Sequence, residues 1–348
     1  MRYLVTGGAG FIGSALVLKL VEQGHDVVTL DAMTYAANPA SLASLAGHPR
    51  HSLVEADICD APRVRALVDD VAPDAVLHLA AESHVDRSIT GPAAFVRTNV
   101  MGTQSMIDAA RAHHGALKGP ARDAFRFLHV STDEVFGSLG PTGYFDEQTR
   151  YDPRSPYSAS KAGSDHLVRA AGETYHLPIL ISNCSNNYGP RQFPEKLIPL
   201  MILNALDGKP LPVYGDGMNV RDWIHVEDHA DALIGILERG TPGETYCVGA
   251  RSERTNVHVV KTICAIMDRL HPAGAPHDRL VTYVADRPGH DRRYAIDSTK
   301  VEREIGWAPK RGFEQALEET VAWYLANEGW WRPIREGRYR GERLGLVG

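Results

Sequence analysis

The sequence has few cysteines, no long hydrophobic run and no excess of positive charge. Its four cysteines are scattered and form no Cys-x-x-Cys pair, which is typical of reduced thiols rather than of a disulfide framework. No apolar segment is long enough to span a bilayer, and a formal net charge of −6 offers nucleic acid no electrostatic attraction. Met1 and Arg2 lead directly into a strand-like stretch, without the separate hydrophobic region of an export signal. We therefore expect a cytoplasmic protein with neither nucleic-acid nor membrane partners.

What the sequence does contain is an alternation of strand-like and helix-like stretches, in 348 residues of which 43% are hydrophobic and 23% charged. Such a composition is ordinary for a globular enzyme. The alternation predicts an α/β fold with a doubly wound parallel sheet of the Rossmann type, whose ligands bind at the carboxyl ends of the strands. The predicted strands are 3–6, 27–30, 52–55, 75–79, 125–130 and 178–181, and the predicted helices include 93–114 and 156–176.

The regular alternation ends near residue 186, where prolines begin to punctuate a mixed segment. We expect residues 1–185 to form the large sheet domain, with returning segments near 218–240. Residues 186–330 are expected to form a smaller C-terminal α/β domain that binds the substrate. The C-terminal tail, residues 331–348, is rich in arginine, and a solvated surface is its expected place.

A glycine-rich turn joins the first predicted strand to an apolar helix. The sequence GGAGFIG (7–13) fits both G-x-G-x-x-G and G-x-x-G-x-x-G, and such glycines let backbone amides approach a pyrophosphate at a helix N-terminus. Asp31 ends the second predicted strand, where a carboxylate accepts hydrogen bonds from the adenosine ribose and repels a 2′-phosphate. A purely structural turn is the alternative, but this context favours a dinucleotide, and NAD over NADP. The predicted contacts in the turn are Gly7, Gly10, Phe11, Ile12 and Gly13.

Tyr157 and Lys161 are four residues apart, so they share one face of the predicted helix 156–176. A free tyrosine ionises near pH 10, so it serves as a base only with help. A nearby ammonium and an oxidised nicotinamide would both stabilise the phenolate and lower the pKa of Tyr157. An exposed pair on a helix surface is the alternative, but the position after a dinucleotide fold favours hydride transfer.

Two adjacent carboxylates, Asp133 and Glu134, follow the predicted strand 125–130. Side by side they repel each other, and burying either one is costly. One interpretation is a helix start, which Ser131 or Thr132 would cap and whose first turn the acidic residues would favour. The other interpretation is chemistry, since neighbouring carboxyl groups in different protonation states suit combined acid and base catalysis.

The glycine turn and the Tyr157–Lys161 pair resemble those of the extended short-chain dehydrogenase/reductase family. Within that family the chain resembles the dTDP-glucose 4,6-dehydratases from residue 1 to about residue 330, while the tail after 330 matches poorly. Phe136 stands where these enzymes usually have tyrosine. The segments that carry the resemblance are HLAAESHVDRSITGP (78–92), STDEV (131–135), SPYSASKA (155–162), NCSNNYGPRQFPEKLIPL (183–200), RDWIHVEDHA (221–230) and DRPGHDRRYAID (286–297).

The resemblance implies a hydro-lyase that uses NAD to convert dTDP-glucose into dTDP-4-keto-6-deoxyglucose, for deoxysugars such as dTDP-rhamnose. Oxidation at C4 makes the C5 hydrogen acidic, water is lost across C5 and C6, and the hydride returns to C6. By resemblance, Asp133 protonates the C6 oxygen and Glu134 removes the C5 proton. Thr132 and Tyr157 would hydrogen-bond the C4 oxygen, and Lys161 would hold the nicotinamide ribose.

The same resemblance supplies the remaining contacts, and a homodimer through the helices 93–114 and 156–176. Further NAD contacts, beside Tyr157 and Lys161, are Asp57, Ile58, Leu79, Ala80, Ala81, Ser83, Thr98 and Asn187. The implied substrate contacts are Ser83, Thr132, Asn186, Lys196, Leu197, Pro212, Tyr214, Arg221, Asn256, Asp286, Arg287 and His290. The cations among them are expected to hold the diphosphate. No spacing of histidine, cysteine and carboxylate predicts a metal site.

Two alternatives stay open. A sugar-nucleotide 4-epimerase, or another sugar dehydratase, would share the fold, but an epimerase has no use for the acid–base pair Asp133–Glu134. A catalytically silent NAD-sensing scaffold would have no use for Tyr157 and Lys161 either.

Overall fold

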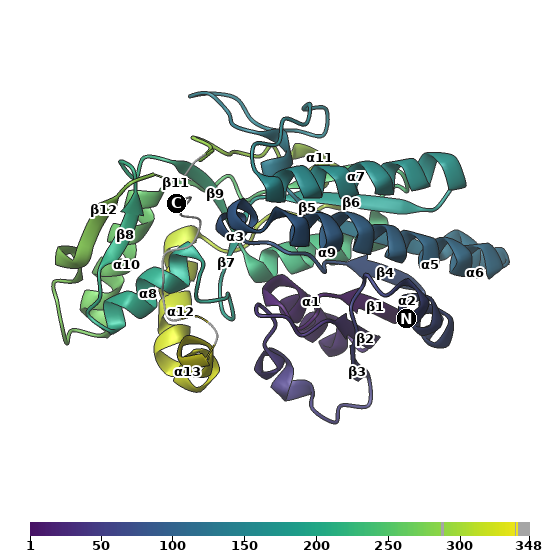
Figure 1. Cartoon of the computed structure of the whole chain (residues 1–348), viewed down its shortest axis with the longest axis horizontal. Coiled ribbons are helices and arrows are strands. Elements are labelled where there is room, and N and C mark those ends of the chain that lie inside the picture. Colours follow the sequence, from purple (N-terminus) through teal and green to yellow (C-terminus); the bar gives the residue numbers. More distant parts are fainter. Residues whose placement is uncertain (287–288, 338, 340–348) are drawn as a thin grey trace.

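The chain folds into a large lobe around a parallel sheet and a smaller lobe at one end of it (Figure 1). The structure is a computed structural model, and it describes residues 1–286, 289–337 and 339. Among these residues the central sheet has seven strands in the order β10-β6-β5-β4-β1-β2-β3, and every neighbouring pair is parallel. The strands are β1 (Arg2–Thr6), β2 (Asp26–Asp31), β3 (His51–Glu55), β4 (Ala75–His78), β5 (Arg126–Thr132), β6 (Ile179–Cys184) and β10 (Thr245–Val248).

The inner strands are continuous buried runs because helices cover both faces of the sheet. Every residue of β4 and of β6 is buried. Parallel neighbours need a crossover connection, which the intervening helices supply. The predicted doubly wound α/β fold is therefore confirmed.

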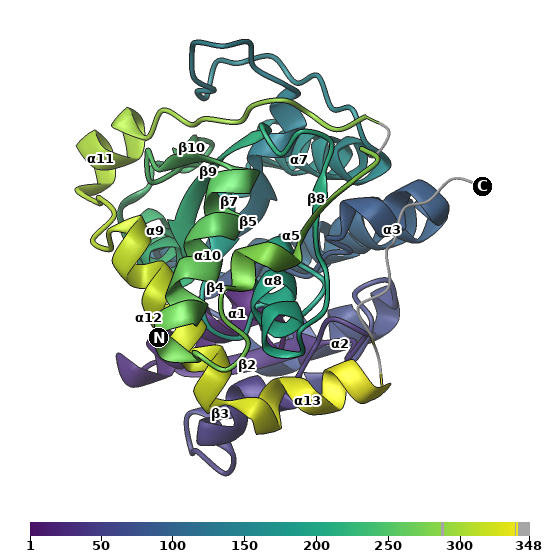
Figure 2. The same ribbon diagram turned by 90° about the vertical axis from the view of Figure 1, so that its left-hand side faces the viewer.

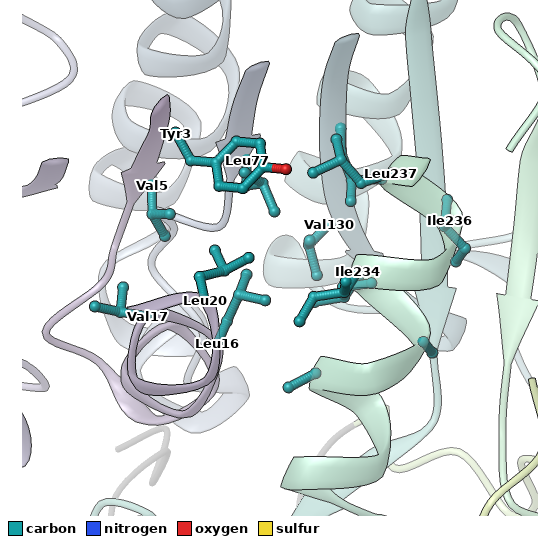
Figure 3. Packing of buried hydrophobic residues seen from close by; sticks show 14 of the residues in the cluster. Tyr3, Val5, Leu16, Val17, Leu20, Leu77, Val130, Ile234, Ile236 and Leu237 are labelled. Atoms are coloured by element: carbon teal, nitrogen blue, oxygen red, sulfur yellow. The ribbon is translucent and has the colours of Figure 1, made fainter. Parts of the chain in front are cut away.

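One face of the sheet is covered by α1 (Phe11–Glu22), α9 (Val226–Arg239) and α11 (Thr299–Ile305), which share a single apolar core with it. Figure 3 shows Leu16 of α1 and Ile234 of α9 directed toward each other beneath the sheet. Both side chains are almost wholly buried, and burying one such side chain contributes about 1.5–3 kcal/mol. A helix from the second half of the chain thus completes the core under the first strand.

The opposite face is covered by helices that come before β6 in the chain. Three of them, α2, α5 and α7, pack on the sheet through an apolar core of their own, separate from the core on the first face. These elements are α2 (Ala61–Val71), α3 (Val85–Thr90), α4 (Pro92–Phe95), the π-helical turn η2 (Val96–Gly102), α5 (Thr103–Ala116), α6 (Gly119–Ala124) and α7 (Pro156–Tyr175).

The smaller lobe has its own apolar core, built from three packed helices, α8, α10 and α12. A three-stranded sheet in the order β11-β9-β7 and a pair β12-β8 complete it (Figures 1 and 2). Its elements are β7 (Asn186–Tyr188), α8 (Leu197–Leu206), β8 (Leu211–Tyr214), β9 (Val220–His225), β11 (Glu253–Thr255), α10 (Asn256–Leu270), η4 (His277–Leu280), β12 (Val281–Val284), α12 (Phe313–Ala326) and α13 (Glu328–Gly337).

The predicted returning stretch 218–240 is divided between the lobes, since its strand β9 belongs to the sheet of the smaller lobe. Helix α9 falls within that stretch, but β10 lies beyond it and pairs with β6 at the edge of the central sheet. Helix α11 follows still later and packs on α9 and β10. The segment 186–330 therefore serves both lobes, which hydrophobic pattern alone did not reveal.

The expectation of a solvated tail is wrong for its first part. In α13, Trp331 and Ile334 are buried in the core of the smaller lobe. Arg335 is only 8% exposed, and its guanidinium lies 3.2 Å from the carboxylate of Asp207. Residues 338 and 340–348 of the tail lie outside the described residues.

Candidate active site

The turn after β1 has no room for side chains at two of its glycines. A Cβ on Gly13 would lie 2.1 Å from the carbonyl oxygen of Gly7, and one on Gly7 would lie 2.8 Å from the backbone nitrogen of Ala80. Gly7 also has φ +71°, which L side chains rarely adopt. The turn therefore brings the N-terminus of α1 against the end of β4, and its glycines Gly7, Gly10 and Gly13 line an open cavity.

Asp31 ends β2 beside this turn and is 8% exposed. Its carboxylate accepts hydrogen bonds from the backbone amides of Ala9 (3.0 Å) and Met33 (2.9 Å). Burial raises the pKa of Asp31, and these two hydrogen bonds oppose the rise. The carboxylate is thus fixed in orientation, with lone pairs left to receive hydroxyl donors from the cavity.

A cavity of about 340 Å³ runs from the glycine turn along the carboxyl ends of the strands. All the residues predicted to bind the cofactor line it, from Gly7 to Asn187. The side chain of Asn187 is held by the protein, since its Oδ1 lies 2.9 Å from His229 Nδ1 and its Nδ2 donates to Ser185 O. Asn187 therefore shapes the wall of the cavity with its polar groups already engaged.

Tyr157 and Lys161 lie on the first turns of α7 and both face the cavity. Ser155 caps the helix: its hydroxyl accepts from Ser158 N, while the Ser158 hydroxyl accepts from Ser155 N. Lys161 is 4% exposed, and its Nζ donates to Val130 O at 2.9 Å. The capping box and this contact fix the helix start against β5.

Burial raises the pKa of Tyr157 well above its ordinary value, the charge of Glu134 raises it further, and a hydrogen bond with Thr132 lowers it only in part. Burial also lowers the pKa of Lys161. Sequence spacing does not report this burial. The lowering of the pKa of Tyr157 by an ammonium together with an oxidised nicotinamide stays a prediction.

Asp133 and Glu134 form the short 3₁₀ turn η3 (Asp133–Phe136) after β5, and Thr132 Oγ1 accepts from Glu134 N at 3.2 Å. The capping interpretation is therefore correct for Thr132, although the turn is not the start of a long helix. Glu134 lines the cavity with Thr132, whereas Asp133 lies behind it at 1% exposure. The two neighbouring carboxyl groups thus have different environments.

Burial raises the pKa of Asp133 well above its ordinary value, and the charges of Glu134 and Asp222 raise it further, against the lowering effect of Arg221. Its Oδ2 has no hydrogen-bond partner among the residues that the structure describes. The enclosure of Asp133 therefore favours the protonated carboxyl group over the carboxylate. Asp133 is thus suited to give a proton, and the carboxyl group of Glu134 lies beside it in the chain.

The predicted substrate contacts fall into two groups. Ser83, Thr132, Asn186 and Lys196 line the cavity, where Lys196 Nζ donates to Ser83 O at 2.8 Å. Outside the lining lie Leu197, Pro212, Tyr214, Arg221, Asn256, Asp286 and His290, all from the smaller lobe, while Arg287 lies outside the described residues.

Some residues of this second group, outside the cavity lining, are in contact with one another. His290 Nδ1 lies 2.6 Å from Asp286 Oδ1, and its ring packs edge-on against Tyr214 with centroids 6.2 Å apart. Arg221 is 5% exposed and stacks on Tyr294 at 4.2 Å. Asp286 and His290 are four residues apart, whereas Tyr214 and Arg221 come from other segments, so spacing could not show the ring contacts of these two.

Sequence reasoning missed several residues of the cavity wall. Most come from the ends of strands and from the loop after Asp31, where a motif search has no specific signal. Glu195 and Gln192 lie within the segment 183–200, and that position was the only available indication. The missed residues include Ala32, Thr34, Ala36, Ala37, Glu82, Val130, Ser131, Cys184, Ser185, Gln192, Phe193 and Glu195.

Within the described ranges, no helix is long and apolar enough to cross a membrane. Across the same ranges, no group of His, Cys, Asp and Glu is arranged to hold a metal ion.

Phe136, which stands in place of a tyrosine, is buried between Phe145 and Tyr151, each with its ring centroid 5.2 Å away.

The profile of the GDP-mannose 4,6 dehydratase family matches residues 4–320. A dTDP-glucose 4,6-dehydratase of Xanthomonas campestris pv. campestris is 58% identical over 347 residues, which are 99% of each chain. The chain belongs to the dTDP-glucose 4,6-dehydratase family. The alignment with this relative extends past residue 330.

Solved structures agree with this membership. The dTDP-glucose 4,6-dehydratase DesIV of Streptomyces venezuelae, solved with NAD and TYD bound, is 45% identical, covers 96% of this chain and 100% of its own, and has a TM-score of 0.87. A UDP-glucose 4-epimerase of Thermotoga maritima is 27% identical, covers 94% of this chain and 99% of its own, and has a TM-score of 0.83. Dehydratases and epimerases thus share this fold, so residues rather than architecture must distinguish them.

Proposed function

We propose that this protein is an NAD-dependent dTDP-glucose 4,6-dehydratase, a hydro-lyase that yields dTDP-4-keto-6-deoxyglucose. The observation that carries the proposal is the pair Asp133 and Glu134, of which the first is enclosed and the second lines the cavity together with Tyr157 and Lys161. Elimination of water needs an acid and a base on neighbouring carbons in addition to a hydride carrier.

The cavity fits NAD on two counts. Gly7 and Gly13 leave no space for a Cβ, so the backbone alone forms the wall where a pyrophosphate would lie. Asp31 presents a fixed carboxylate for ribose hydroxyls and repels a 2′-phosphate. When bound, NAD accepts the hydride from the sugar C4 and returns it to C6.

The first step needs a base at the C4 hydroxyl. Tyr157 is the proposed base, with Thr132 as its hydrogen-bond partner and the second contact to the C4 oxygen. Burial raises the pKa of Tyr157, so its phenolate would need the stabilisation that a bound, positively charged nicotinamide would supply. Lys161 is the proposed contact to the nicotinamide ribose, held in place through Val130 O.

The second step removes water from the 4-keto sugar. Glu134 takes the C5 proton from its position on the cavity wall. Asp133, whose burial favours the protonated form, gives its proton to the departing C6 hydroxyl. The proton taken by Glu134 and the proton given by Asp133 balance, and one water leaves.

The same observations disfavour the two alternatives, a 4-epimerase and a catalytically silent scaffold. A 4-epimerase interconverts C4 stereoisomers without elimination, so the cost of burying Asp133 next to Glu134 would serve no step. A silent scaffold would gain nothing from a lysine kept 4% exposed at the base of the cavity.

The remaining proposals concern the surroundings of the reaction. The cations Lys196, Arg221 and Arg287 would hold the diphosphate, with the other predicted substrate residues around them. A homodimer through η2, α5 and α7 is supported by Val96 and Met101, which are 52% and 60% exposed on that face. A location in the cytoplasm fits a sugar-nucleotide enzyme with reduced cysteines.

Mass spectrometry of dTDP-glucose after incubation with the protein tests the function. We expect loss of one water from the sugar nucleotide, and no loss with Tyr157→Phe under the same conditions. Recovery of an isomer of unchanged mass would instead establish an epimerase. Unchanged dTDP-glucose together with a water-depleted GDP- or UDP-sugar would keep the reaction and overturn the substrate.

A further inference from the structure

Behind Lys161 lies a buried carboxylate that the reaction above does not use. Asp165 follows Lys161 by one turn of α7 and has no exposed surface. Its Oδ2 accepts from Ser131 Oγ (2.8 Å), from the hydroxyl of Tyr151 (2.9 Å) and from Asn183 Nδ2 (3.3 Å). Its Oδ1 lies 3.1 Å from His129 Nε2. One carboxylate thus ties α7 to β5, β6 and the segment before the helix.

The carboxylate is ionised although it is buried. Burial by itself raises the pKa of Asp165, but the hydrogen bond from His129 and the charge of Lys161 bring it below the ordinary value. Burial lowers the pKa of His129 to about 4, so this imidazole is neutral at physiological pH. The charge of Lys161 acts on Asp165 across His129, whose Nε2 lies 3.3 Å from Lys161 Nζ and 3.1 Å from Asp165 Oδ1. Arg169 is joined to Asp165 through the hydroxyl of Tyr151 (3.1 Å).

The position of the Lys161 ammonium depends on β5, the strand to which Asp165 is hydrogen-bonded. Its Nζ donates to Val130 O at 2.9 Å and lies 3.3 Å from His129 Nε2. His129 and Ser131 flank that carbonyl, and both bind Asp165. Alternate residues of a strand share one face, so His129 and Ser131 point together toward α7. The carboxylate fixes the stretch of β5 against which the ammonium is placed.

We propose that Asp165 is a positioning residue for the hydride-transfer step, which balances the ammonium of Lys161 and holds it in register with Tyr157 through His129 and Ser131. Tyr157, Lys161 and Asp165 follow one another at intervals of four residues, so the phenol, the ammonium and the carboxylate lie in one line along the helix. This inference rests on the proposed function, because it assigns Asp165 to the first step of that reaction.

The test compares Asp165→Asn with Asp228→Asn in the NAD-loaded enzyme. Asparagine keeps the shape and removes the charge. Asp228 is a matched control, since it is 1% exposed and its Oδ1 lies 2.5 Å from Arg311, yet it lies outside the cavity wall. The measurement is the first-turnover appearance of reduced nicotinamide absorbance after rapid mixing with dTDP-glucose, together with KM.

We expect Asp165→Asn to slow the first turnover by about 10²-fold, the effect of misplacing a reacting group by about 1 Å. KM should stay unchanged, since the sugar-nucleotide contacts are elsewhere, and Asp228→Asn should react at the wild-type rate per folded molecule. A wild-type rate in Asp165→Asn, or an equal loss in both variants, overturns the proposal. Absence of any absorbance change in the wild type would instead overturn the proposed function.

Tyr151→Phe covers the case in which Asp165→Asn does not fold. It removes one hydrogen bond to Oδ2 and leaves the charge in place. A first turnover roughly tenfold slower is expected, as for one hydrogen bond to a charged group. A wild-type first turnover in Tyr151→Phe overturns the assignment.

Discussion

Asp133 and Glu134 are neighbours in the chain, yet one side chain is enclosed and the other faces the cavity. Their assignment as acid and base came from resemblance, whereas the structure adds a physical cause for the difference. Burial raises the pKa of Asp133, and the charge of Glu134 raises it further. Residue types in a motif can be read from sequence, but the protonation state depends on enclosure by distant segments.

Asp133→Asn should slow the loss of water by about 10²–10⁴-fold, because it cannot deliver a proton to the departing oxygen. Glu134→Gln should abolish exchange of the C5 hydrogen with deuterated solvent. C4 oxidation should be affected less in both variants, since Tyr157, Thr132 and Lys161 remain. Rapid-quench analysis of bound sugars measures both steps. Dehydration at the wild-type rate in both variants would reduce the pair to the capping turn that Thr132 begins.

Asp222 gives a pH prediction at the same scale. Burial raises the pKa of Asp222 from 3.8 to about 6 in the folded protein. Because the folded state binds this proton more tightly than the unfolded chain, the resulting stabilisation is complete below about pH 4 and is lost as the pH rises through about 6. Asp222→Asn should remove this pH dependence and raise the free energy of unfolding near neutral pH by roughly 1–3 kcal/mol. Urea unfolding at a series of pH values tests it, and parallel curves for both proteins would contradict it.

Among the elements, the strand–turn–helix unit at the N-terminus was the most predictable part of the molecule. The strand β1 begins one residue before its predicted start, and the glycine spacing indicated the turn correctly. The reason is local: a Cβ at Gly13 meets a carbonyl only six residues away in the chain. Contacts of short sequence separation leave a motif, and contacts between remote segments do not.

Gly13→Ala and Gly115→Ala test that local requirement. At Gly13 a methyl group would overlap the carbonyl of Gly7, so we expect lost NAD binding and a destabilised turn. Gly115 lies within α5 with open space around it, and alanine there should stabilise the helix by up to about 1 kcal/mol. Isothermal titration with NAD and thermal unfolding measure the two effects. Wild-type NAD affinity in Gly13→Ala would show that the turn tolerates a side chain.

At the scale of the whole molecule, sequence predicted the sheet but not how the second half of the chain wraps around it. The prolines after residue 186 coincide with a change of organisation, yet β10 and α11 return to the large lobe. Helix α13 packs in the smaller lobe and is hydrogen-bonded to Asn38 and Ser41 of the large lobe. In the site, the same limit applied to Asp165, whose four partners are spread from His129 to Asn183. Tertiary proximity of this kind has no signature in composition or periodicity.

Helix α13 is connected to the wall of the cofactor cavity by a short chain of hydrogen bonds. Trp330 Nε1 donates to Ser41 Oγ at 3.1 Å, and Asn38 Nδ2 donates to Trp330 O at 3.3 Å, both in or beside η1 (Pro39–Leu45). The backbone amide of Asn38 in turn donates to Ala9 O in the glycine turn at 3.0 Å. Figure 2 shows α13 running along the base of the molecule below β2 and β3. The C-terminal helix thus supports the loop that lines the NAD cavity.

Trp330→Phe should therefore weaken the binding of NAD, while Trp331→Phe should leave it unchanged. Both tryptophans are buried in the smaller lobe's core, and each loses one indole hydrogen bond, with a cost of about 1 kcal/mol in stability. The bond of Trp331 goes to Tyr324 O within its own lobe, so its loss leaves the loop before η1 in place. We expect the rate of NAD release to rise several-fold in Trp330→Phe only, since a single hydrogen bond of about 1 kcal/mol corresponds to roughly fivefold. Stopped-flow measurement of NAD release in both variants decides the matter, and equal release rates would show that α13 stabilises the smaller lobe alone.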